Sequence, residues 1–99
     1  MAGQVGLDPA TREIVPGGIR EETRRALENC KAILEAAGFR LADVVQVQVL
    51  LADINDYEAM NEVYATYFPE SPPAHAAYAV AGIPRGARVE IVMTAAWGR

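Results

Sequence analysis

The most regular pattern along the chain is helical and extends from Ile19 to Ala37. Apolar or small side chains recur there every three or four residues, which predicts an amphipathic helix. Glu21 and Glu22 lie in its first turn, where the helix dipole favours negative charge. Gly38 follows as a residue that readily adopts the left-handed conformation ending a helix. The predicted stripe consists of Thr23, Ala26, Leu27, Cys30, Ile33, Leu34 and Ala37.

A different pattern, with period two, begins after this helix. The segment Val44 to Leu51 alternates and is rich in β-branched residues, which predicts a strand. One predicted face carries Val45, Val47, Val49 and Leu51, and the other carries Val44, Gln46, Gln48 and Leu50. The polar middle of the second face is typical of a strand that is covered by a helix on one side and partly exposed to solvent on the other.

A second helix is predicted from about Asp56 to Phe68. Asn55 followed by Glu58 is similar to a capping box, and Pro69 ends the segment. The stripe of this helix consists of Tyr57, Met60, Tyr64, Tyr67 and Phe68. These side chains are predicted to belong mainly to the core, with a cleft-lining role left open for Tyr67 or Phe68.

Two more strands are predicted at about Ala74–Val80 and Val89–Ala96, separated by a turn at residues 82–86. Residues 1–7 include the end of a first strand, and residues 8–18 form a loop rich in proline and glycine. The element order is therefore β-loop-α-β-α-β-β. It predicts a single α+β domain over residues 1–99, with two helices on one face of a sheet.

Composition and charge narrow the function classes. The 99 residues include 13 acidic and nine basic side chains and carry a net charge of −4. A nucleic-acid partner is not expected, because no basic patch is present. No apolar run is long enough to span a membrane, and no signal peptide is recognised, so a cytoplasmic location is predicted. A chain this short buries a limited share of its surface, so partner subunits are expected.

The chemistry-bearing side chains are few. Cys30 is the only cysteine, so an internal disulfide and a zinc site of clustered Cys and His are excluded, and no cofactor motif appears. Cys30 is most simply a small core residue. His75, the only histidine, shares a strand face with Ala77 and Ala79, whose small side chains leave room for a pocket. It is either a proton-transfer group or a hydrogen-bonded residue at a subunit edge.

Glu90 and Asn61 are polar residues inside predicted elements. Glu90 lies between Val89 and Ile91 in the last strand, and a general base or a structural ion pair fits it equally well. Asn61 lies within the second helix, where asparagine has no propensity advantage, which suggests a specific hydrogen bond.

Three blocks of the sequence resemble one known family. They are ETRRALENCKAILEAAG, DVVQVQVLLADINDYEAMNEVYATYFPE and the PPAHA…GIPRGARVEI stretch. Together they are similar to the Rid family of reactive intermediate deaminases, also called the YjgF or endoribonuclease L-PSP family. The resemblance implies a chorismate-mutase-like α+β fold and a homotrimer with a barrel-like core and clefts between subunits. It also implies hydrolysis of small enamines or imines without metal or organic cofactor.

The family's site residues match this chain only in part. Gly3 and Gln4 fit the family's Ser-Gly-Gln segment, with Ala2 at the serine, and Asn61 fits its helix asparagine. His75 stands at the position of the arginine that grips the substrate carboxylate. Ala77 stands at a cysteine position. Glu90 matches the first glutamate of the last strand, while Val92 replaces the second, water-positioning glutamate.

These departures leave two functions open. The resemblance implies a deaminase-type hydrolase with His75 and Glu90 as catalytic candidates, or a lyase or cyclase variant. Gly3, Gln4, Asn61, Ala77 and Val92 would then contact the substrate. A non-catalytic trimer that binds a small molecule or a protein is the alternative. Because histidine cannot supply a fixed two-pronged grip, activity on 2-aminoacrylate is predicted to be weak or absent. The family's N-terminal hairpin, with its tyrosine, has no counterpart in this sequence.

Overall fold

The computed structural model describes residues 3–69 and 74–96, and its elements follow the predicted order. The strands are β1 (Gln4–Val5), β2 (Val44–Leu51), β3 (Ala74–Ala79) and β4 (Val89–Ala95). The helices are α1 (Ile19–Ala36) and α2 (Tyr57–Tyr67), and short 3-10 turns occupy Leu41–Asp43, Ile54–Asp56 and Pro84–Gly86.

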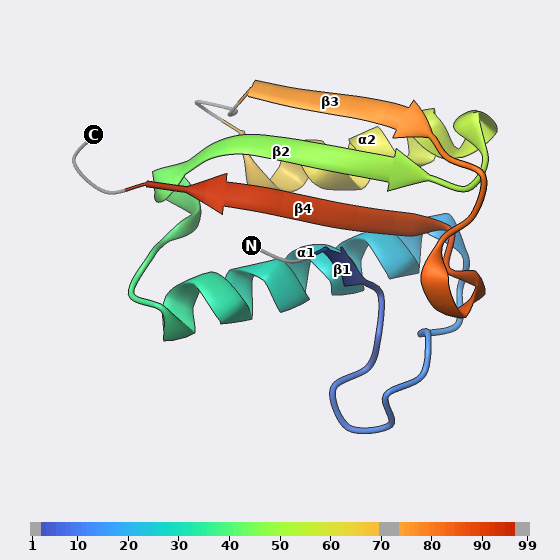
Figure 1. The fold of residues 1–99 in the computed structure, drawn as a ribbon, viewed down its shortest axis with the longest axis horizontal. Helices are drawn as coiled ribbons and strands as arrows, with labels where there is room; N and C mark the ends of the chain where they lie inside the picture. Colours follow the sequence, from blue (N-terminus) through green and yellow to red (C-terminus); the bar gives the residue numbers. More distant parts are fainter. Residues whose placement is uncertain (1–2, 70–73, 97–99) are drawn as a thin grey trace.

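The strands of the described residues form one mixed sheet in the order β1-β4-β2-β3 (Figure 1). Strand β4 is antiparallel to both β1 and β2, whereas β2 and β3 run parallel. A parallel pair needs a long crossover connection, and α2 provides it here. Strand β3 therefore lies at one edge of the sheet, directly after the helix that crosses over.

Both helices pack on the same face of this sheet, which confirms the predicted α+β architecture. The core lies between them and the inward side chains of the two central strands. Val47 is paired with Met93, and Val49 with Ile91, and all four are fully buried. The helices contribute Ala26, Leu27, Cys30, Leu34, Met60, Val63, Tyr64 and Phe68 to the core. Cys30 is thus the small core residue that the sequence predicts.

Helix α1 ends as predicted, but its buried stripe is shifted. Gly38 has φ 88°, and the amide of Phe39 donates to the Leu34 carbonyl at 2.8 Å, which is a Schellman-type end. Ile33 is 42% exposed, because it lines an open groove beside Phe39 instead of the core. Glu22, expected only to favour the helix dipole, is buried and accepts a hydrogen bond from the Arg88 amide at 2.8 Å. It thereby joins α1 to the start of β4.

Strand β2 departs from strict alternation at its beginning. The register with β4 shifts between Val44 and Gln46, so Val44 is buried while Val45 is only half-buried. A bulge of this kind places one extra residue in the strand and turns the side chains before it to the other face. The prediction that Val45 shares the face of Val47 is therefore wrong, whereas the alternation from Gln46 onward is confirmed.

The start of α2 is also different from the prediction. Asn55 lies in a 3-10 turn whose first amides are bound by Asp53, which accepts from the Asn55 amide at 2.9 Å. Helix α2 begins at Tyr57 without a side-chain cap from Asp56. The capping box predicted for Asn55 and Glu58 is absent from this turn, and Glu58 is exposed.

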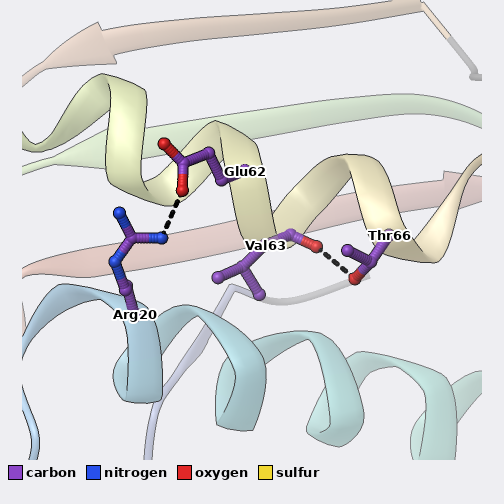
Figure 2. Close-up of polar contacts among 4 residues, drawn as sticks. All are labelled: Arg20, Glu62, Val63 and Thr66. Carbon is purple, nitrogen blue, oxygen red and sulfur yellow. Dashed lines mark hydrogen bonds and ion pairs between the residues drawn. The ribbon is translucent and has the colours of Figure 1, made fainter.

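Polar contacts join the two helices at the surface. Arg20 of α1 donates to Glu62 of α2 at 2.6 Å, and Figure 2 shows this ion pair beside the bond from Thr66 to the Val63 carbonyl. The pair is solvent-exposed, so its contribution to stability is small. Farther along, the Tyr67 hydroxyl donates to Glu28 at 2.6 Å. Arg20–Glu62 and Tyr67–Glu28 are thus two polar contacts between α1 and α2. Over the residues described, no helix is long and apolar enough to cross a membrane.

Candidate functional site

An open groove lies where the beginning of α2 faces the edge strand β3. Its volume is about 620 Å³, within the range of small-molecule sites. Its lining comes from the turn before α2, the first turn of α2 and the middle of β3. The lining residues are Ile54, Asn55, Tyr57, Glu58, His75 and Ala77.

His75 enters this groove from β3. It is paired with Val47 of β2 and so lies on the helix-facing side of the sheet, and Ala77 is paired with Val49 on the same side. The prediction that His75 and Ala77 share a strand face next to open space is confirmed. Because β3 is an edge strand, the imidazole is exposed and can reach a molecule in the groove.

Tyr64 supports the imidazole from α2. The two ring centroids are 4.7 Å apart, with an interplanar angle of 35°. Tyr64 is buried, and its hydroxyl has no hydrogen-bond partner among the residues described. Burial raises the pKa of Tyr64 to about 12, so this side chain stays neutral at physiological pH. It acts as an apolar wall behind His75 and not as an acid or base.

Asn61 lies close to this wall along the helix. It is half-buried and is placed one turn after Tyr57 and one turn before Tyr64 on α2. Side chains three and four residues apart share one helix face, so Asn61 lies on the side of α2 that carries these two tyrosines. The predicted helix asparagine is therefore on the groove's helix, although it is not one of the residues that line the groove.

Glu90, Gly3 and Val92 lie on the opposite face of the sheet. Glu90 is paired with Leu50 and Val5, and Val92 with Gln48, all on the face that the helices leave uncovered. A Cβ atom added to Gly3 would overlap the Glu90 carboxylate, so glycine at this position leaves room for that side chain. These three predicted residues are brought together, but within one chain the sheet separates them from His75.

Gln4 belongs to neither group. It is paired with Ile91, so it lies on the helix-facing side of β1, at the edge of the sheet opposite β3. It lines a second cavity together with Asn29 of α1. The two halves of the predicted Gly3-Gln4 segment thus point to opposite faces.

Sequence reasoning missed most of the groove. The sequence predicts Asn55 and Glu58 as a helix start and Tyr57 as core, and it gives no prediction for Ile54. Tyr57 is instead 37% exposed and lines the groove with the other three residues. The parallel pairing of β2 and β3 could have indicated these residues. A helix that connects two parallel strands packs against both of them, so α2 lies beside β2 and β3. That rule places the first turn of α2 near β3 only once the strand order is known.

The charges around the groove are few. Among the described residues that line it, Glu58 supplies a carboxylate and His75 an imidazole, and none is a lysine or arginine. No group of His, Cys, Asp and Glu side chains suited to a metal occurs in residues 3–69 and 74–96. Cys30 is buried in the core, and burial raises the pKa of its thiol to about 12, so it is not a nucleophile. The chemistry available here is proton transfer by an imidazole in a partly apolar groove.

Comparison with known proteins settles the family. The family model described as Endoribonuclease L-PSP matches residues 1–97. The chain belongs to this family. The resemblance to Rid proteins read from the three sequence blocks is thereby confirmed.

Individual relatives agree with this assignment. A mouse protein named 2-iminobutanoate/2-iminopropanoate deaminase is 54% identical over 98 residues, which are 99% of this chain and 73% of the relative. The structure of RidA from a Psychrobacter species is 44% identical, with a TM-score of 0.87, over 92% of this chain and 73% of that one. E. coli TdcF, solved with bound serine, is 33% identical with a TM-score of 0.89, over 97% and 78%.

Proposed function

We propose that this protein hydrolyses a small reactive imine or enamine to a carbonyl compound and ammonia, using the groove at His75. The observation that carries the proposal is the position of the imidazole: it projects from an edge strand into a groove of about 620 Å³ in a chain 54% identical to a protein named as an imine deaminase. A non-catalytic binding trimer has no comparable support among the relatives.

The reaction needs two proton transfers and one water molecule. Water adds to the carbon of the C=N bond, which leaves a carbon bearing one hydroxyl and one amino group. The proton of this hydroxyl group then moves to the amino nitrogen. The C–N bond breaks, and ammonia leaves as the C=O bond forms. The imidazole of His75 is the side chain of the groove suited to accept the proton of the attacking water and to return it to the leaving nitrogen.

The groove would bind its substrate without the arginine that, in the family pattern, grips the carboxylate of an imino acid. The lining has Tyr57 and Ile54 as apolar surface, Asn55 as a polar contact and Glu58 as a carboxylate, with Ala77 leaving space next to His75. A substrate carboxylate would have no fixed guanidinium to bind and would approach Glu58. The groove therefore favours an uncharged or cationic imine over a 2-imino acid.

We also propose that the protein is a homotrimer whose cleft combines His75 of one protomer with Glu90 of a neighbour. Within one chain the two side chains lie on opposite faces of the sheet. On the face without helices, Glu90 is the only charged residue among the described strand positions, and Tyr78 is 42% exposed there. Such a face suits burial against another subunit.

A cytoplasmic location is part of the same proposal. The single cysteine is buried and is not used in a disulfide, as suits a reducing compartment. Cell fractionation with an antibody to the chain tests this, and recovery in an extracellular or membrane fraction would contradict it.

The experiment for the activity is ammonia release from a panel of imines that includes 2-aminoacrylate and imines without a carboxylate. The variants are His75→Ala and, as a matched control, Glu35→Gln, which changes an exposed residue on α1. Loss of general acid–base catalysis predicts a fall of about 10²–10⁴-fold for His75→Ala, with no change for the control. Turnover that is equal in all three proteins would refute the role of His75, and no turnover on any imine would refute the function.

A further inference from the structure

A second cavity lies on the other side of the molecule from His75. It has a volume of about 320 Å³ and is formed by β1, the loop after it, α1 and the turn before β4. Arg12 comes from the loop and Arg85 from the turn, 73 residues apart in the sequence. We propose that this cavity is a binding site for a small oxyanion, either a phosphate group or a carboxylate, held by Arg12 and Arg85.

The two arginines converge on one space. The Arg85 guanidinium donates to the backbone carbonyl of Arg12 at 3.4 Å, so the loop and the turn are in contact at this point. Both side chains line the cavity and both are exposed. Two positive groups gathered in this way repel each other unless an anion lies between them.

Neither arginine has an acidic partner in the described part of the chain. Arg20, Arg24, Arg40 and Arg88 each form an ion pair with a carboxylate, and Arg25 donates to Asn29. Arg12 and Arg85 form no such pair among residues 3–69 and 74–96. Their guanidinium groups remain available to bind an anion, for which the planar fork of arginine is well suited.

The backbone supports the same conclusion. Arg12 and Arg85 both have φ 63°, and they are the two non-glycine residues of positive φ in the described chain. The left-handed conformation is unfavourable for a residue with a Cβ atom, and glycine adopts it freely. Strained positions of this kind gather at ligand sites, and here both place an arginine on the same cavity.

Asn29 and Asp8 also line this cavity, beside the two arginines. Asn29 donates from its amide to the carbonyls of Val5 and Leu7 at 3.2 and 2.9 Å, which ties β1 to α1. Asp8 also lines the cavity, but one of its oxygens accepts the amides of Ala10 and Thr11 within its own turn. Two guanidinium groups therefore face one carboxylate, and the charge of the lining favours an anion.

The site is tested by calorimetric titration, once with sodium phosphate and once with sodium acetate. Sodium chloride keeps the ionic strength constant in both titrations. The variants are Arg12→Gly and Arg85→Gly, and the control is Arg40→Gln, which removes the same charge from an exposed position outside the cavity. Both glycine variants relieve a left-handed arginine, so they should fold, and a melting temperature no lower than that of the natural chain checks this.

The expected result is binding by the natural chain and the control, weakened about tenfold or more in each glycine variant because a charge-assisted contact is lost. Binding of phosphate with this pattern identifies a phosphate site, and binding of acetate with this pattern identifies a carboxylate site. Equal affinities in all four proteins, or no heat beyond that of chloride, would overturn the proposal. The readout does not use deaminase activity, so it stands apart from the proposed function.

Discussion

The ring of His75 lies against the ring of Tyr64, with centroids 4.7 Å apart and planes tilted by 35°. His75 belongs to an exposed edge strand, and Tyr64 to the buried side of α2. The contact therefore gives a surface imidazole a fixed wall from the core. Phe68 continues this wall, with its ring centroid 5.1 Å from that of Tyr64.

This contact predicts that the ring of Tyr64 matters and that its hydroxyl does not. The hydroxyl is buried without a partner among the described residues, so Tyr64→Phe should leave the free energy of unfolding within about 1 kcal/mol of the natural value, or raise it. Tyr64→Ala removes the ring and should cost about 3–5 kcal/mol. Urea unfolding of both variants measures this. A large loss of stability in Tyr64→Phe would mean that the hydroxyl has a hydrogen bond.

A second prediction concerns His75 and Val92, two of the positions where the sequence differs from the family pattern that it resembles. His75→Arg together with Val92→Glu should increase ammonia release from 2-aminoacrylate, because arginine supplies a two-pronged grip for a carboxylate. Ammonia release per minute is compared with that of the natural chain and of each single variant. If the double variant folds, as judged by its melting temperature, and gains nothing, the groove is not the family's imine site.

A third prediction follows from the buried thiol. The pKa of Cys30 is raised by burial from 9.0 to about 12, so the folded state keeps a proton that the unfolded state loses. This contribution to stability is complete below pH 9 and declines as the pH rises toward 12. Urea midpoints between pH 8 and 11 should therefore fall less steeply in Cys30→Ala than in the natural chain. Thiol reagents at pH 8 should react with Cys30 only as the protein unfolds, and rapid reaction of the folded protein would contradict its burial.

A fourth prediction tests how closely β1 approaches α1. A Cβ atom added to Gly6 would lie 2.7 Å from the backbone carbonyl oxygen of Glu22, which cannot move without shifting the helix. Gly6→Ala should therefore destabilise the fold by about 1–3 kcal/mol. Gly82→Ala is the matched control, because its Cβ atom would meet nothing within 4 Å. Equal melting temperatures for the two variants would show that β1 is more loosely packed than described.

The sequence predicts most of the fold because its patterns are local. The period of 3.6 over α1, the alternation of β2 from Gln46 onward and the glycine at position 38 each depend on neighbouring residues, and each is confirmed. The errors arise where contacts distant in sequence decide the outcome. Val45 is misplaced because a bulge depends on pairing with β4. Ile33 is misplaced because it lines an open groove with Phe39 of the following loop and Ala95 of the sheet.

The site is less predictable for the same reason. His75 and Ala77 follow from alternation within one strand, so their shared face is predictable. The lining residues Tyr57 and Glu58 depend on how α2 crosses over to β3, which no local pattern contains. The convergence of Arg12 and Arg85 likewise joins two turns that the sequence keeps far apart.

The proposed cleft is shared between protomers, with His75 from one and Glu90 from the next. Chains carrying His75→Ala and chains carrying Glu90→Gln are each assayed alone for ammonia release, and then after being unfolded and refolded together in equal amounts. Each should be nearly inactive alone. In mixed trimers a cleft is intact only when one protomer supplies a natural His75 and the adjacent protomer supplies a natural Glu90. Each condition is met in about half of the cases, so about a quarter of the natural activity should return. A mixture as inactive as its components, under conditions where the natural chain regains its activity on refolding, would contradict the shared cleft.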